Sequence, residues 1–152
     1  MNRRRGRSRL NRFISLPGGL TEEVALARAH TNLEAHRTAA LEAVDAAIEA
    51  MGVLAGDCAA KPAARTRLHE MAYEIASMAG LYNLVALGIA AQSLCDLIEG
   101  CRLRGAWDVA GVGVHLGAIR LLRRPEHAVG AAEGEILSGL ARIVKREALA
   151  SA

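Results

Sequence analysis

The side chains best suited to metal or acid–base chemistry in this chain are its five histidines. A carboxylate di-iron site in a helical protein uses Glu-x-x-His pairs on facing helices. No histidine here has a glutamate three positions before it; the five are His30, His36, His69, His115 and His127. His30 and His36 lie six residues apart, nearly opposite on a helix, and cannot share one ion. We predict no metal and no cofactor, with each histidine exposed or half-buried.

Covalent chemistry has no supporting motif either. The chain contains no Gly-x-Ser-x-Gly elbow, and its one Gly-Val-Gly match, Gly111 to Gly113, falls inside a helical segment. Three cysteines, Cys58, Cys95 and Cys101, form no Cys-x-x-Cys pair. Cys95 falls on an apolar helical face, as expected for a core cysteine of a reduced, cytoplasmic protein. These patterns favour a protein that is not an enzyme.

Charge is distributed unevenly along the chain. Residues 1–12 carry six arginines and no acidic residue, so a net charge of +3 leaves the remaining residues at about −3. We interpret residues 1–12 as a disordered basic tail, and the body as mildly acidic. With few aromatic residues and no basic groove, the body does not favour specific binding of nucleic acid.

The longest stretch without charge, residues 75–95, is long enough to cross a bilayer. Glycine, asparagine, glutamine and serine residues interrupt it, and Asn83 resembles a helix N-cap. We therefore interpret the stretch as a buried helix–turn–helix and predict no membrane span.

Helical periodicity and helix-ending residues predict the elements that must position any site. Thr21 is a good N-cap, Pro62 suits a first turn, Gly105 ends a helix and Asp108 can cap the next. We expect helices over residues 21–54, 63–79, 84–103, 108–122 and 131–149. Glycines at 111, 113 and 117 weaken the fourth, which is either closely packed or poorly defined.

Apolar residues repeat at steps of three and four along each helix, so each has one inward face. Short connections between such helices are typical of an antiparallel bundle. We predict an all-α fold, an antiparallel four-helix bundle in which a fifth helix is short or broken. Residues 13–152 are expected to form a single domain.

The segment from Leu68 to Glu99 resembles the core hairpin of bacterial histidine-phosphotransfer domains. Tyr73-Glu74-Ile75-Ala76-Ser77 matches the position of that family's His-x-x-Lys-Gly pattern, and Leu81-Tyr82-Asn83 matches its Thr-Phe-Gly position. Ser93-Leu94-Cys95 matches a Ser-Leu-Cys sequence seen one helix later in alphaproteobacterial members. The overall form, with FISLPGGLT before the first helix, is similar to small chemotaxis-operon accessory proteins of the CheE kind.

The departures from the family pattern set the expected function. Tyr73 replaces the phosphorylated histidine, Ala76 the lysine and Ser77 the glycine. A phenol is a poor nucleophile without a base, and no cation from this turn would match a phosphoryl charge. The resemblance therefore implies a non-catalytic adaptor that docks a receiver domain or a chemotaxis kinase in a two-component phosphorelay. The expected partner-binding residues are His69, Tyr73, Glu74, Ser77 and Tyr82.

Two alternatives stay open. His69 lies one turn before Tyr73 on the same face and could serve as the acceptor of an active phosphotransferase. Alternatively, the chain is a helical interaction protein unrelated to phosphorelay, which self-associates as a homodimer through Ala-rich faces and contacts anions through its arginine tail. The geometric question is whether the Tyr73 ring points to solvent.

Overall fold

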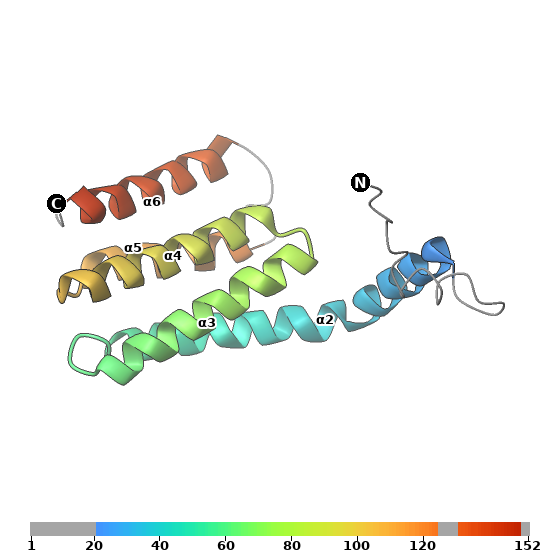
Figure 1. Ribbon diagram of the computed structural model, residues 1–152, viewed down its shortest axis with the longest axis horizontal. Helices are drawn as coiled ribbons and strands as arrows, with labels where there is room; N and C mark the ends of the chain where they lie inside the picture. The colour runs from blue at the N-terminus through green and yellow to red at the C-terminus, as the bar shows by residue number, and fades with distance from the viewer. Residues whose placement is uncertain (1–20, 125–130, 150–152) are drawn as a thin grey trace, which may run out of the picture. The chain divides into compact units, whose positions relative to one another are not determined.

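The computed structural model describes residues 21–124 and 131–149, which form five helices and no strand (Figure 1). The helices are α2 (Glu22–Ala55), α3 (Pro62–Leu81), α4 (Val85–Arg104), α5 (Val109–Arg123) and α6 (Ala131–Leu149). The predicted all-α fold is confirmed, and each helix begins and ends within two residues of its expected position. The expected tail at residues 1–12, the FISLPGG lead-in and His127 lie outside the described residues.

Local side-chain and backbone chemistry explains four of the helix ends. The Val24 amide donates to Thr21 Oγ1 over 3.4 Å at the start of α2, and Pro62 occupies the first turn of α3. The Gly111 amide donates to Asp108 Oδ1 over 2.8 Å, which confirms the predicted cap of α5. Gly105 ends α4 with a φ of +69°, a conformation that glycine adopts without a steric penalty.

The turn between α3 and α4 differs from its expected form. Asn83 does not cap α4; that position belongs to Leu84, without a side-chain hydrogen bond. Asn83 instead follows α3 with a φ of +58°, and the Leu84 amide donates to the Ala79 carbonyl over 2.9 Å. This bond is typical of a Schellman helix end, where asparagine can replace glycine in the left-handed conformation.

The chain divides into two units, residues 1–38 and residues 39–152. Within the first unit, the structure describes residues 21–38, the N-terminal part of α2, whose side chains are mostly exposed. An Arg37–Glu34 ion pair of 3.3 Å lies on this segment. The second unit contains the core. The single domain expected over residues 13–152 stays a prediction.

Residues 39–55 of α2 contribute Val44, Ile48 and Met51 to the core that α3, α4 and α5 share. The helix pairs α3–α4 and α4–α5 contact each other. Ion pairs join α2 to α5, with Arg123 Nη2 2.8 Å from Asp45 Oδ2 and Arg120 Nε 3.8 Å from Glu49 Oε1. Because residue numbers rise along α2 as they fall along α5, these two helices are antiparallel. The arrangement is that of an antiparallel four-helix bundle.

The fifth helix, α6, is neither short nor broken. It spans 19 residues and contacts α4 and α5. Arg104, at the end of α4, donates to the Glu147 carbonyl over 2.6 Å and forms an ion pair with the Glu147 carboxylate. Both side chains are largely buried, and both stand near helix C-termini, so α6 runs parallel to α4.

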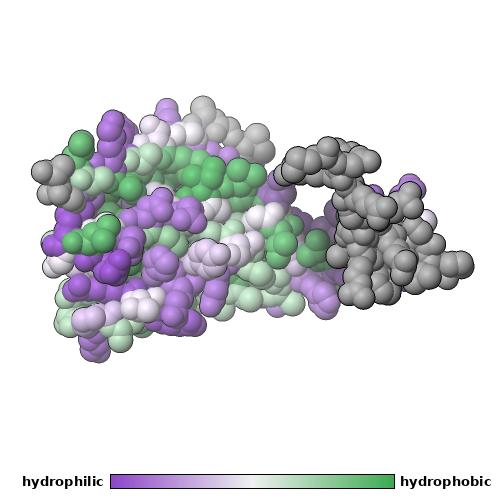
Figure 2. Space-filling view, viewed as in Figure 1, coloured by the Kyte–Doolittle hydropathy of each residue, from purple (hydrophilic) through white to green (hydrophobic). Residues whose placement is uncertain are grey.

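The core lies where the inward faces of these helices meet. Its fully buried large side chains include Met51, Leu68, Ile75, Leu87, Leu94, Leu97 and Ile119. Gly111 is buried here, and a Cβ atom on it would lie 2.2 Å from Asp108 Oδ2. This close approach explains one of the three glycines in α5, which forms a continuous helix. On the viewed face, apolar and polar residues are interspersed (Figure 2).

None of the described helices is long and apolar enough to cross a membrane. The uncharged stretch at residues 75–95 is divided between the end of α3 and the first half of α4.

Candidate functional site

Tyr73 stands in the middle of α3, on the side that faces away from the core. Its side chain is 60% exposed, whereas Leu68, Ala72 and Ile75 are fully buried on the opposite side. The expected outward position of the Tyr73 ring is therefore confirmed. Its hydroxyl group has no hydrogen-bond partner in the part of the chain that the structure describes.

The surroundings of Tyr73 are acidic or neutral. Arg67 Nη1 lies 3.1 Å from Glu70 Oε2 and 3.7 Å from Glu74 Oε1, so two carboxylates match its charge. The Ser77 hydroxyl donates to the Tyr73 carbonyl over 2.9 Å. Among the described residues, this face of α3 therefore offers a phosphoryl group no unmatched arginine or lysine.

Three of the expected partner-binding residues share one wall of a groove between α2 and α3, the α2–α3 groove. Its volume is about 380 Å³. Tyr73, Glu74 and Ser77 line it from α3 together with Ile75 and Met78, and Ala43, Val44 and Ala47 line it from α2. The small residues of α2 leave space beside Tyr73 on this side.

Tyr82 does not belong to this exposed surface. Its side chain is only 6% exposed, and its backbone amide donates to the Met78 carbonyl over 3.3 Å at the end of α3. The chain reverses here between two helices whose apolar faces pack together, and the ring is covered in the turn. We therefore leave Tyr82 out of the docking surface.

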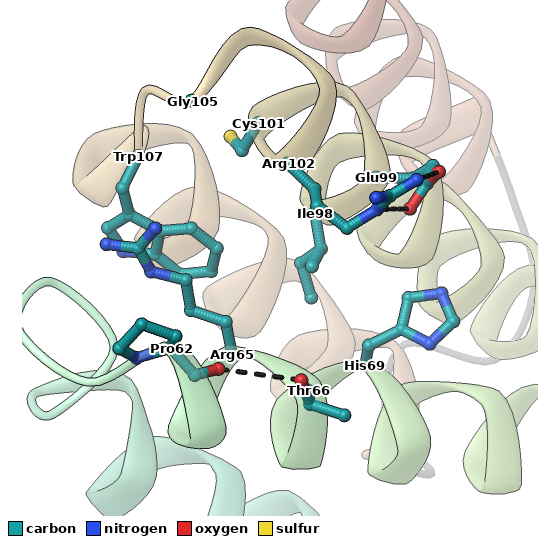
Figure 3. Close-up of a pocket in the computed structure, with 10 residues that line it drawn as sticks. All are labelled: Pro62, Arg65, Thr66, His69, Ile98, Glu99, Cys101, Arg102, Gly105 and Trp107. Atoms are coloured by element: carbon teal, nitrogen blue, oxygen red, sulfur yellow. Dashed lines mark hydrogen bonds and ion pairs between the residues drawn. The ribbon is translucent and has the colours of Figure 1, made fainter.

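His69 is separated from the groove and lies in a second cavity, between α3 and α4, which we call the Trp107 pocket (Figure 3). Its volume is about 360 Å³. Its lining residues are Pro62, Arg65, Thr66, His69, Ile98, Glu99, Cys101, Arg102, Gly105 and Trp107. His69 is half-buried, and its imidazole forms no hydrogen bond within the described residues.

One end of the Trp107 pocket is built around Arg65. The Arg65 Nε group donates to the Cys58 carbonyl over 2.6 Å, and Nη2 donates to the Ala59 carbonyl over 2.9 Å. The guanidinium carbon lies 5.0 Å from the centroid of the Trp107 ring, within the range of a cation–π contact. Arg65 thereby connects the loop before α3 to the loop before α5.

The other end of the pocket carries an ion pair on α4. Arg102 donates to both oxygens of Glu99, over 2.8 Å from Nε and 2.6 Å from Nη2. These hydrogen bonds hold the pKa of Glu99 below its usual range, and the nearby His69 contributes to the same direction. The Glu99 carboxylate therefore stays ionised beside His69.

The largest difference from expectation is His115, which is fully buried. Its Nε2 lies 3.0 Å from Ser93 Oγ, and its Nδ1 lies 2.8 Å from the Gly111 carbonyl. Because a carbonyl only accepts, Nδ1 carries the proton and Nε2 accepts from Ser93. Burial lowers the pKa of His115, which its bond to Gly111 opposes. With both nitrogens satisfied, a neutral imidazole fits the core.

The cysteines are buried and free, as the sequence indicates for Cys95. Burial raises the pKa of Cys95 to about 11 and also raises that of Cys58. Thiols with raised pKa values are poor nucleophiles at neutral pH. Within residues 21–124 and 131–149, no group of three or more His, Cys, Asp or Glu side chains could hold a metal ion.

Together the fold and these surfaces define an all-α protein of the helical-bundle class. Comparison with models of protein families, with curated protein sequences and with solved structures gives no match.

Proposed function

We propose that this chain is a non-catalytic, phosphotransfer-like adaptor that docks a receiver domain or a kinase of a two-component system. Docking uses the exposed face of α3, with Tyr73, Glu74 and Ser77 at its centre. The observation that carries the proposal is the 60% exposure of Tyr73 in the middle of a helix that belongs to a four-helix bundle.

The absence of catalysis in this proposal follows from the surroundings of the phenol. A receiver domain presents an aspartate and accepts or gives a phosphoryl group, which needs an acceptor side chain and a matching positive charge. Tyr73 stands among Glu70 and Glu74, and the charge of Arg67 is matched by both. The adaptor would therefore bind through the exposed surface of α3 and the Tyr73 ring, since tyrosine is a residue type that often dominates binding at interfaces.

Binding is tested by titrating the full chain with each receiver domain and histidine kinase of its organism, using calorimetry. We expect one partner to bind, and Tyr73→Ala to weaken its affinity by about tenfold or more, as for an aromatic hot spot. The matched control is Leu103→Ala on α4, a 73% exposed apolar residue away from this face, and its affinity should equal that of the wild type. No binding by any partner, or equal losses in both variants, would refute the proposal.

A second experiment rebuilds the phosphoryl-accepting sequence pattern, whereas the first removes the Tyr73 side chain. The triple variant Tyr73→His, Ala76→Lys, Ser77→Gly recreates the family pattern on the same turn. Incubated with a phosphorylated partner receiver, it should acquire phosphohistidine, whereas the wild type should acquire no label. A folded triple variant that binds the receiver but stays unlabelled would show that position 73 does not meet the receiver aspartate.

A second candidate function is phosphoryl transfer through His69. The observation that favours it is that the His69 imidazole, which forms no hydrogen bond within the described residues, lines a pocket that also contains Arg102. If this candidate is right, the wild type acquires an acid-labile label that His69→Gln abolishes and Tyr73→Phe retains. The nearby ionised Glu99, which repels a phosphoryl group, argues against it.

A further inference from the structure

The Trp107 pocket combines a flat aromatic ring, apolar walls and more positive than negative charge. In Figure 3, Trp107, Arg65 and Pro62 lie at one end, and His69 with the Glu99–Arg102 ion pair lies at the other. Ile98 lies between the two ends. From this arrangement we propose that the pocket binds a small, planar aromatic monocarboxylate. The inference stands independently of the docking function, because Tyr73 does not line this pocket.

The polar groups of the pocket favour an anion over a cation. Arg65 and Arg102 each carry a positive charge, and Glu99 supplies the single carboxylate among the lining residues. Arg102 already neutralises Glu99 through two hydrogen bonds. Within the described residues, the partners of the Arg65 guanidinium are two loop carbonyls and the face of Trp107.

Donors also outnumber acceptors in the pocket. The hydrogen bonds of Arg65 and Arg102 leave from Nε and Nη2, so each Nη1 group has no partner in the described part of the chain. The imidazole of His69 adds a further N–H group without a partner there. A carboxylate accepts from such donors and is the planar anion that suits a guanidinium edge.

The apolar walls and the volume of the pocket indicate that the remainder of the ligand is an aromatic ring system. Ile98 and Cys101 are almost fully buried and form an apolar surface between the two ends. Trp107 is half-buried, and because Arg65 lies over one face of its ring, the indole offers a planar ligand its edge and its remaining surface. A volume of about 360 Å³ is at the small end of the range for ligand sites, roughly 300–1,000 Å³. One or two fused rings with a carboxylate match this size.

Trp107 is the only tryptophan in the chain, so one indole N–H signal in an NMR spectrum reports on this pocket. The probe is 2-naphthoate, and its neutral matched control is 2-naphthalenemethanol. We expect 2-naphthoate to shift the indole signal saturably, with an affinity at least about tenfold above that of the alcohol, because charged hydrogen bonds add to ring packing. No saturable shift, or equal affinity for both probes, would overturn the proposal.

Variants then locate the carboxylate. Arg102→Gln and His69→Gln should each weaken 2-naphthoate binding several-fold and leave the weak binding of the alcohol unchanged. The control Arg142→Gln removes an exposed arginine of α6 and should bind like the wild type. If Arg102→Gln and His69→Gln both match Arg142→Gln, the assignment of the carboxylate is wrong. Tyr73→Ala should also bind like the wild type, which separates this result from the test of docking.

Discussion

The two edges of α3 differ in how they are built, although the sequence places their key residues on one stripe. Toward α2, Tyr73, Glu74 and Ser77 line an open groove with small residues opposite, and the phenol has no partner in the described residues. Toward α4, Arg65 holds two loop carbonyls and the Trp107 ring. One helix thus has an open edge toward α2 and, toward α4, an edge fixed by hydrogen bonds and a cation–π contact.

Helix geometry explains the separation. Four residues correspond to slightly more than one turn, so a stripe at this spacing drifts by about 40° at each step. His69 and Tyr73 are neighbours on the helix surface, yet the drift is sufficient to place His69 in the Trp107 pocket and Ser77 in the α2–α3 groove.

The largest expected effect of the difference between the two edges of α3 is on the free energy of unfolding. Arg65→Met removes two hydrogen bonds to carbonyls and a cation–π contact, and should lower the free energy of unfolding by about 2 kcal/mol. Arg67→Met, two residues away, removes only exposed ion pairs and should cost about 0.5 kcal/mol or less. Urea denaturation measures both. Equal losses of unfolding free energy in the two variants would mean that Arg65 contributes no more to stability than the exposed Arg67.

A smaller effect concerns the buried histidine of the core, His115, and depends on pH. The pKa of His115 is lowered below its ordinary value of 6.5, mainly by burial. The unfolded chain therefore binds a proton more readily, and stability should fall as the pH decreases below about 6.5.

The variant His115→Gln tests this assignment. The slope of unfolding free energy against pH between 5 and 7 should become flatter in His115→Gln than in the wild type. Urea denaturation at several pH values provides the slope. A slope that survives in His115→Gln would assign the pH dependence to other groups.

The smallest expected effect compares two hydroxyl groups, one on each edge. Ser77 donates to the Tyr73 carbonyl over 2.9 Å, and Thr66 donates to the Pro62 carbonyl over 3.5 Å. Both bonds reach back four residues along an exposed helix surface, where alanine is the better helix former. Ser77→Ala and Thr66→Ala should each raise the free energy of unfolding by about 0.5 kcal/mol or less. A loss above 1 kcal/mol in either variant would reveal a role beyond the helix.

Helix positions could be predicted well because their ends carry explicit signals. Pro62, Gly105 and Asp108 act as expected. The role predicted for Asn83 is wrong, because asparagine is common both at a helix N-cap and in the left-handed conformation at a helix C-terminus. The hydrogen bond from the Leu84 amide to the Ala79 carbonyl shows that Asn83 belongs to the C-terminal end of α3.

The site was harder to predict than the fold, because it depends on contacts between helices. The outward position of Tyr73 follows from periodicity within α3 alone. The burial of His115 requires Ser93 of α4 as a partner 22 residues away, and the pocket around His69 requires Arg102 and Trp107 from beyond α3. His115 and its neighbour Leu116 are both buried because α5 contacts both α4 and α6.

The central place of α4 has a consequence for the order in which the fold opens. This helix contacts α3, α5 and α6, so its amides are released only when several interfaces separate. In deuterated water, backbone exchange should be slowest along α4. The exposed N-terminal residues of α2, which belong to the other unit, should exchange first.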